Sequence, residues 1–100
     1  MIVHIVMFKF KKENFDANIQ EVKQKLEELP ALISQLKCLE VGVDFSHSDR
    51  SFDLSLYSSF SSKQDLESYA LHPKHLEVVE FIKSVTTESK AVDYILGDTK

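Results

Sequence analysis

The sequence contains little glycine, proline or cysteine, and it contains no tryptophan. Two glycines and two prolines among 100 residues exclude a glycine-rich or proline-rich low-complexity chain and indicate regular elements joined by short connections. Cys38 is the one cysteine, which excludes an intramolecular disulfide. A lone cysteine beside a predicted strand is usually a small hydrophobic residue, so we expect no chemistry from it.

Neither sign of charge dominates, and long hydrophobic runs are absent. The formal net charge is −4, and lysines alternate with acids along residues 21–28, as on a solvated helix face. No basic stripe or RNA-type aromatic motif is present, so we expect no nucleic-acid partner. The apolar start, residues 1–8, is too short to span a bilayer and lacks the features of a signal peptide. We therefore expect a cytoplasmic protein with no membrane partner.

Several catalytic motifs are also missing. The sequence has no glycine-rich phosphate loop, no His-Glu-x-x-His pair and no serine elbow between a strand and a helix. These absences exclude hydride transfer with a Rossmann-bound cofactor and P-loop hydrolysis. We expect no cofactor and no metal.

What the chain does contain is ordinary for a globular protein: 43% apolar and 28% charged residues. Its length fits a single domain over residues 1–100. Alternating apolar and polar side chains predict strands, and apolar side chains every three or four residues predict helices. The predicted strands are residues 2–11, 39–45, 52–60 and 91–96; the predicted helices are 14–29, 61–71 and 73–85, with a short turn at 31–36 and a frayed tail at 97–100.

The helical stretches each carry one apolar stripe. The stripe of the predicted helix 14–29 consists of Phe15, Ile19, Val22, Leu26 and Leu29. The stripe of the predicted helix 73–85 consists of Leu76, Val79, Ile82 and Val85, widened by Val78 and Phe81. The run Ser61–Gln64 fits a capping box that begins the middle helix, with Ser61 as the cap.

The order of elements predicts an α+β fold of the ferredoxin-like βαββαβ type with a four-stranded antiparallel sheet. Right-handed crossovers place the helices on one face. A large bare apolar patch is rare in a monomer, so we expect the other face to pair with that of an identical subunit, forming a two-subunit barrel. The predicted uncovered face carries Val3, Ile5, Met7, Tyr57 and one set from Val92, Tyr94 and Leu96, together with Glu40, Asp44, Asp53 and Ser55.

The chain resembles the stress-responsive A/B barrel (Dabb) domain family, a family of dimeric α+β barrels. The stretches that carry the resemblance are residues 2–11, 39–44, 60–62 leading into 69–75, and 92–94. The resemblance implies a homodimer whose activity is mostly unassigned in the family. One plant branch acts as polyketide cyclases, and its catalytic tyrosine and histidine match Tyr69 and His75. After His75 this chain has branched aliphatic residues where the cyclases have aromatic and small ones, which predicts a narrower pocket. Other barrel relatives are monooxygenases or degrade haem.

A candidate site follows from Tyr69, His72 and His75, which share a helix face if the helix is continuous. A histidine near neutral pKa can remove a proton next to a carbonyl, and a tyrosine hydroxyl can donate to the enolate oxygen that forms. We expect Tyr69 and His75 to be catalytic in a cavity between sheet and helices. The predicted ligand-binding residues are His4, His72, Phe8 and Leu56.

Three interpretations of this cluster stay open. In a structural interpretation, His72 caps the helix that starts at Pro73 and His75 bonds a backbone carbonyl. In a functional one, the domain binds a small hydrophobic molecule between sheet and helices, or acts as a cyclase-like or other cofactor-free enzyme. A metal site needs His72 and His75 to converge with a third ligand such as His4 or Glu67. Under the structural interpretation, the domain is a non-catalytic structural dimer.

Overall fold

Four strands and four helices follow one another in the predicted βαββαβ order, with the first helical segment divided in two. The computed structural model describes residues 1–97; residues 98–100, the end of the predicted tail, lie outside the described residues. The elements are β1 (Ile2–Phe10), α1 (Phe15–Glu27), α2 (Leu29–Leu32), β2 (Cys38–Val43), β3 (Leu54–Phe60), α3 (Lys63–Leu71), α4 (Pro73–Val85) and β4 (Thr86–Ile95).

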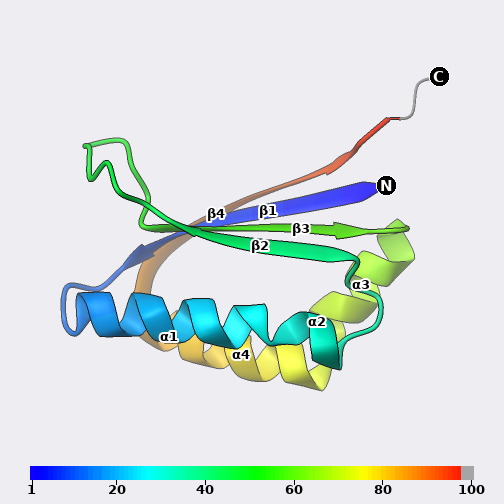
Figure 1. Cartoon of the computed structure of the whole chain (residues 1–100), viewed down its shortest axis with the longest axis horizontal. Coiled ribbons are helices and arrows are strands. Elements are labelled where there is room, and N and C mark those ends of the chain that lie inside the picture. Colours follow the sequence, from blue (N-terminus) through cyan, green and yellow to red (C-terminus); the bar gives the residue numbers. More distant parts are fainter. Residues whose placement is uncertain (98–100) are drawn as a thin grey trace.

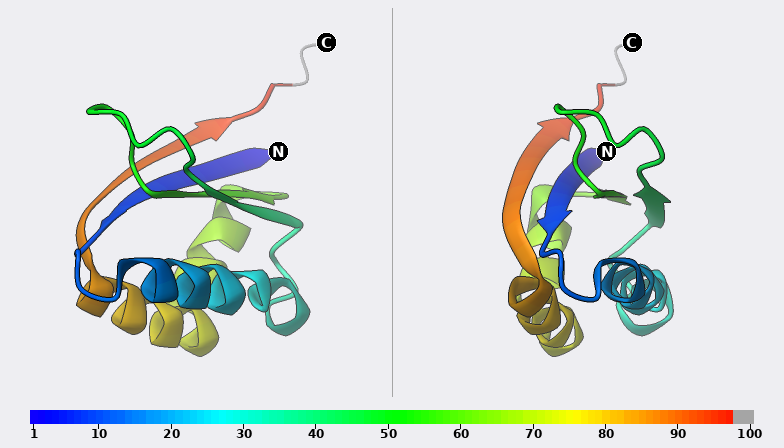
Figure 2. Two further views of the ribbon diagram at one scale, coloured as in Figure 1. Left: turned by 60° about the vertical axis from the view of Figure 1, so that its left-hand side comes forward. Right: turned by 90° about the vertical axis from the view of Figure 1, so that its left-hand side faces the viewer.

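The strands form one antiparallel sheet in the order β2-β3-β1-β4. The helices α1 and α4 lie side by side against one face of it (Figure 1). The two rotated views show the same two layers, and they show β4 curving down into the helix layer (Figure 2). This arrangement confirms the ferredoxin-like α+β prediction.

The core forms where the helix stripes meet the sheet. In α1 the side chains of Ile19, Val22 and Leu26 are buried, as predicted. In α4 the buried side chains are Val78, Ile82 and Val85, whereas Leu76 is 46% exposed. The predicted stripe of α4 is therefore confirmed except at Leu76, and the residue one turn before Val78 is His75.

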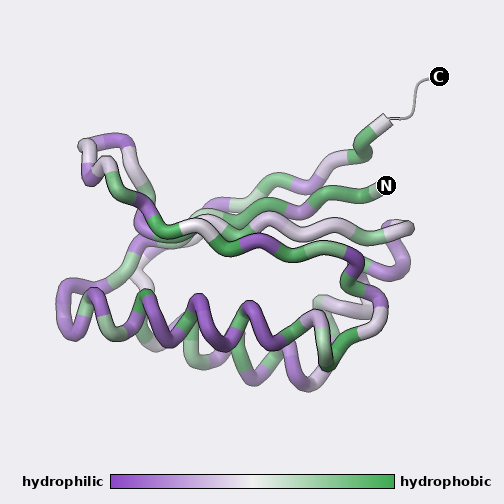
Figure 3. The backbone as a smooth tube through the Cα atoms, in the orientation of Figure 1, coloured by the Kyte–Doolittle hydropathy of each residue, from purple (hydrophilic) through white to green (hydrophobic). Residues whose placement is uncertain are grey.

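The other face of the sheet has no helix over it among the described residues (Figure 2). Met7, Val92 and Tyr94 are 40%, 53% and 41% exposed there. Val3 lies on the same face as Tyr94, as predicted. It is nevertheless fully buried, since it sits on the inner strand β1 between Ser59 and Tyr94. The exposed apolar side chains of this face thus lie on the middle of β1 and on the second half of β4, and both strands include green segments in the tube of Figure 3.

Two local predictions were wrong. The last strand begins at Thr86, not at residue 91, because its polar first half pairs with β1 as an exposed edge strand. The cap of α3 is Ser62, whose hydroxyl accepts from the amide of Asp65 at 3.1 Å, and not Ser61.

No helix in residues 1–97 combines the length and apolar character needed to cross a membrane.

Candidate functional site

A cavity of about 230 Å³ lies between the sheet and α4. It is smaller than the roughly 300–1,000 Å³ of pockets for drug-sized ligands. Apolar side chains from both layers form most of its wall. The lining residues are His4, Val6, Phe8, Leu26, Leu56, His75, Val78, Val79, Ile82, Lys83, Thr86 and Ser89.

His75 reaches this cavity because the chain breaks just before it. The predicted division into two helices is confirmed, and the condition for a shared face of Tyr69, His72 and His75 is not met: α3 ends at Leu71, and His72 is extended, with φ −66° and ψ 134°. The residue before a proline avoids the α region, so α4 starts afresh at Pro73. This break directs the first turn of α4, and with it His75, back toward the sheet.

The imidazole of His75 is held in one tautomer. Its Nδ1 lies 3.0 Å from the carbonyl oxygen of Ala70. A carbonyl only accepts, so Nδ1 carries the hydrogen and Nε2 of the neutral ring keeps its lone pair.

Burial lowers the pKa of His75 below its ordinary value. The hydrogen bond to Ala70 acts in the opposite direction, and the nearby His4 and His72 add smaller lowering contributions. The ring is therefore a neutral proton acceptor at pH 7.

Tyr69 lies behind His75 and does not line the cavity. The two ring centroids are 4.3 Å apart, and the Tyr69 ring also packs against Phe60 at 5.0 Å. Its side chain is 1% exposed, and its hydroxyl has no hydrogen-bond partner within residues 1–97. Burial raises the pKa of Tyr69 to about 12, so the hydroxyl stays protonated and is available as a donor.

His4 enters the cavity from β1 and is oriented by β4. It pairs in register with Asp93, and its Nδ1 contacts a carboxylate oxygen of that residue. When Nδ1–H donates to the carboxylate, Nε2 of His4 is left as an acceptor. The sequence argument placed His4 here but missed Asp93, because the register of β4 was not predicted.

His72 does not join the cluster. Its Nδ1 accepts from the amide of Lys74 at 3.1 Å and so caps α4, as the structural interpretation expected. With this ring engaged, the proposed metal set of His72, His75 and His4 or Glu67 does not form. No three His, Cys, Asp or Glu side chains in the described part of the chain are placed to hold a metal ion.

Of the predicted site residues, the structure brings four into one cavity: His4, Phe8, Leu56 and His75. Tyr69 stands directly behind them, and His72 is outside. Lys83, Thr86 and Ser89 were missed. Two of these three belong to the polar first half of β4, which carried no strand signal.

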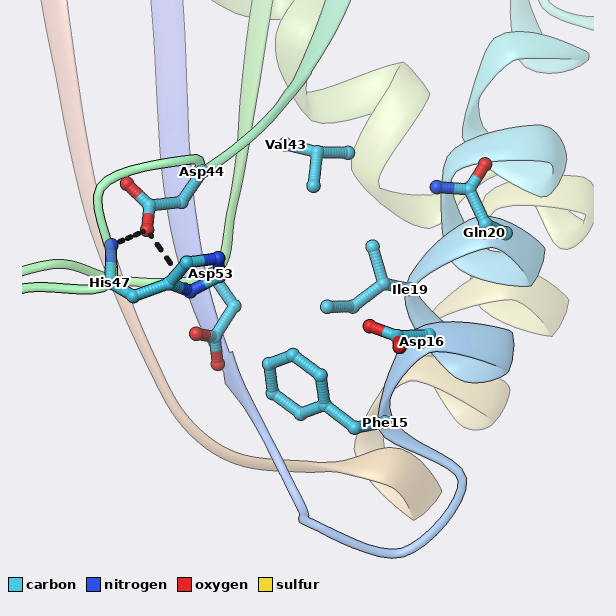
Figure 4. A pocket seen from close by; sticks show the side chains of 8 residues that line it. All are labelled: Phe15, Asp16, Ile19, Gln20, Val43, Asp44, His47 and Asp53. Carbon is cyan, nitrogen blue, oxygen red and sulfur yellow. Dashed lines mark hydrogen bonds and ion pairs between the residues drawn. The ribbon is translucent and has the colours of Figure 1, made fainter.

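A second cavity, of about 270 Å³, opens between α1 and the β2–β3 loop (Figure 4). The carboxylate of Asp44 accepts from the amide of His47 at 2.7 Å, and that of Asp53 accepts from the amide of Phe10 at 2.8 Å, where β1 changes register. Asp44 and Asp53 therefore line this cavity beside Phe15, and Asp44 also borders a hollow with Met7 and Ser55 of the open sheet face, where it was predicted. They hold the loop and the strand bulge, so this cavity is a weaker candidate.

Known proteins share this arrangement. A ferredoxin-like protein of unknown function from Bacteroides fragilis, described as dimeric, has a TM-score of 0.87, is 29% identical and is covered over 95% of both chains. Two stress-response A/B barrel domain-containing proteins of Arabidopsis thaliana are 31% and 35% identical, over 95% of this chain in each case. The chain spans 47% and 36% of their respective lengths.

The fold and cavity define an α+β barrel domain of the ferredoxin-like class. The chain matches the family model described as "Stress responsive A/B Barrel Domain" (Dabb) over residues 2–96. It belongs to this family, which confirms the resemblance. Membership does not establish a specific activity, since functions differ among domains of one fold.

Proposed function

We propose that this domain binds a small, mainly apolar molecule in the cavity between the sheet and α4. The observation that carries the proposal is the position of the His75 ring on the wall of a mainly apolar cavity, with Nδ1 fixed on Ala70 and Nε2 unused. A few convergent polar groups in an apolar pocket are typical of ligand sites. A histidine with a shifted pKa in such a pocket supports a functional role further.

Binding can be tested with 2-octanone, a small neutral ketone, followed by amide NMR shifts. We expect the shifted amides to cluster on α4 and on β1. Val79→Trp fills the cavity and is expected to abolish the shifts, whereas Leu76→Trp places the same ring on the exposed side of α4 and is expected to preserve them. Equal binding by both variants would contradict the proposed cavity.

We further propose that two copies pair through their open sheet faces. The exposed apolar side chains of Met7, Val92 and Tyr94 support this pairing, as does the dimeric state described for the Bacteroides relative. Light scattering is expected to give twice the 11.5 kDa chain mass. Val92→Glu is expected to produce monomers, while Leu71→Glu, at an equally exposed apolar side chain on α3, is expected to leave the dimer intact.

A second candidate function is cofactor-free proton transfer at carbon, favoured by the protonation state of His75. In this reaction Nε2 takes a proton from a carbon next to a carbonyl, and the electron pair moves onto the carbonyl oxygen. Tyr69 is not proposed as the donor to that enolate oxygen, because its hydroxyl is buried behind His75 and does not line the cavity. A cyclase-like aldol step is one such reaction.

Exchange of the 2-octanone α-hydrogens for deuterium tests this second candidate separately from binding. Wild-type protein is expected to exchange these hydrogens faster than buffer alone does. His75→Gln is expected to lower the exchange rate to that of buffer alone, while 2-octanone still binds. Binding without exchange would leave a non-catalytic binding domain.

A further inference from the structure

The cavity has two polar ends. His75 and Lys83 are eight residues apart on α4, which separates them by about 12 Å along the helix. Tyr69 packs against both His75 and Phe60, and Phe60 pairs with Ile2, two residues before His4 on β1, so the two histidines share one end. Lys83 shares the other end with Ser89, because α4 runs directly into β4 at Thr86. Apolar side chains occupy the wall between the two ends.

The charges around this cavity are unbalanced. Lys83 is the cationic side chain that lines it, since the His75 ring is neutral, and no carboxylate lines it. Asp93 contacts the ring of His4. Within the described residues Lys83 takes part in no ion pair, and Glu88 on β4 pairs with Lys90 at 3.4 Å. A cleft with this balance attracts anions.

Two hydroxyl side chains line the cavity together with Lys83. Thr86 Oγ1 donates to the carbonyl of Ile82 at 2.8 Å. Ser89 lines the cavity from β4, and its hydroxyl makes no hydrogen bond to another residue in the range 1–97. Ser89 can therefore donate to a bound oxygen, and an anionic oxygen is the stronger acceptor.

We propose that the ligand of this cavity is a small amphipathic carboxylate. Its carboxylate binds Lys83 and Ser89, and its apolar chain extends about 12 Å toward His4 and His75. This inference rests on the proposed ligand-binding function and adds to it the charge and the direction of the ligand. A medium-length straight-chain acid such as octanoate matches this length and the cavity of about 230 Å³.

The test measures dissociation constants for octanoate and for the neutral 1-octanol by calorimetry. The proteins are wild type, Lys83→Met and a matched control, Lys74→Met, which removes an exposed lysine of the same helix outside this cavity. Lys83→Met is expected to weaken octanoate binding about fivefold, in line with a partly exposed ion pair. Octanol binding is expected to be the same in all three proteins. Added salt is expected to weaken octanoate binding to wild type but not to Lys83→Met.

The outcomes separate this inference from the proposed function. If octanol binds but the dissociation constant of octanoate is the same in wild type and Lys83→Met, the carboxylate inference is overturned, whereas the proposal of an apolar binding cavity is kept. Equal weakening by Lys83→Met and Lys74→Met also overturns it, because the effect then reflects general surface charge. If neither compound binds, both the inference and the proposed function fail. A role of Lys83 only at the C-terminal end of the α4 dipole predicts a small loss of stability with unchanged octanoate affinity.

Discussion

Replacing Tyr69 with phenylalanine is expected to stabilise the protein. The Tyr69 side chain is 1% exposed, and its hydroxyl has no partner within residues 1–97. A buried polar group without a hydrogen bond costs about 1–3 kcal/mol. Phenylalanine removes that cost and keeps the ring, which packs against Phe60 and His75 at centroid distances of 5.0 and 4.3 Å.

The expected gain is about 1 kcal/mol, at the low end of that range, because the surrounding side chains relax around the hydroxyl in the wild type. For a domain of this size, 1 kcal/mol corresponds to a rise in Tm of about 4–8 °C. Thermal and urea unfolding at one fixed protein concentration measure the change. Concentration must be fixed because the proposed subunit pairing would make the apparent stability depend on it.

Tyr69→Ala is the matched control. It removes the ring as well as the hydroxyl and is expected to cost about 3–5 kcal/mol. A loss of about 1 kcal/mol or more in Tyr69→Phe would refute the reasoning, since it would mean that the hydroxyl is hydrogen-bonded in the folded protein.

Three further results are expected. Ser62→Ala should lower the free energy of unfolding by about 1 kcal/mol through loss of the α3 cap, while Ser61→Ala should change it by less than about 0.5 kcal/mol; similar losses would contradict the assignment of the cap. The pKa of His75 is lower in the folded than in the unfolded chain. Its contribution to the free energy of unfolding is therefore fully present above about pH 6.5. This contribution declines as pH falls toward the folded pKa, because the unfolded chain then binds more protons than the folded one. Urea titrations between pH 8 and pH 5 should show this decline reduced in His75→Gln and unchanged in His47→Gln, a variant in the exposed β2–β3 loop. Leu26→Ala should cost about 2–5 kcal/mol in urea unfolding, since Leu26 is 1% exposed between α1 and the sheet; a cost below about 1 kcal/mol would contradict that packing.

The fold was predictable because most elements bury one face. Alternation along β1, β2 and β3 and the stripe of α1 record that burial directly. β4 was predicted five residues too short, because Thr86–Lys90 is exposed on an edge strand and leaves no apolar pattern. Its extent depends on backbone pairing with β1, which the side chains do not encode.

The candidate site was predictable only in part. His4, Phe8, Leu56 and His75 could be placed together, because strand parity and helix order decide which face each occupies. The separation of His72 from the cavity follows from the break before Pro73, where its ring caps α4. Lys83 and Ser89 required the start of β4 to be known. Asp93 required its register against His4.

The most direct test of the account is an imidazole NMR measurement on ¹⁵N-labelled protein at pH 7. It assigns the protonation state and tautomer of His75, with His75→Gln identifying the signal. The account predicts a neutral ring with its hydrogen on Nδ1, donated to Ala70, and an unprotonated Nε2 whose signal moves when 2-octanone is added. A charged ring, or a hydrogen on Nε2, would contradict the account, because no lone pair would then be available to a ligand.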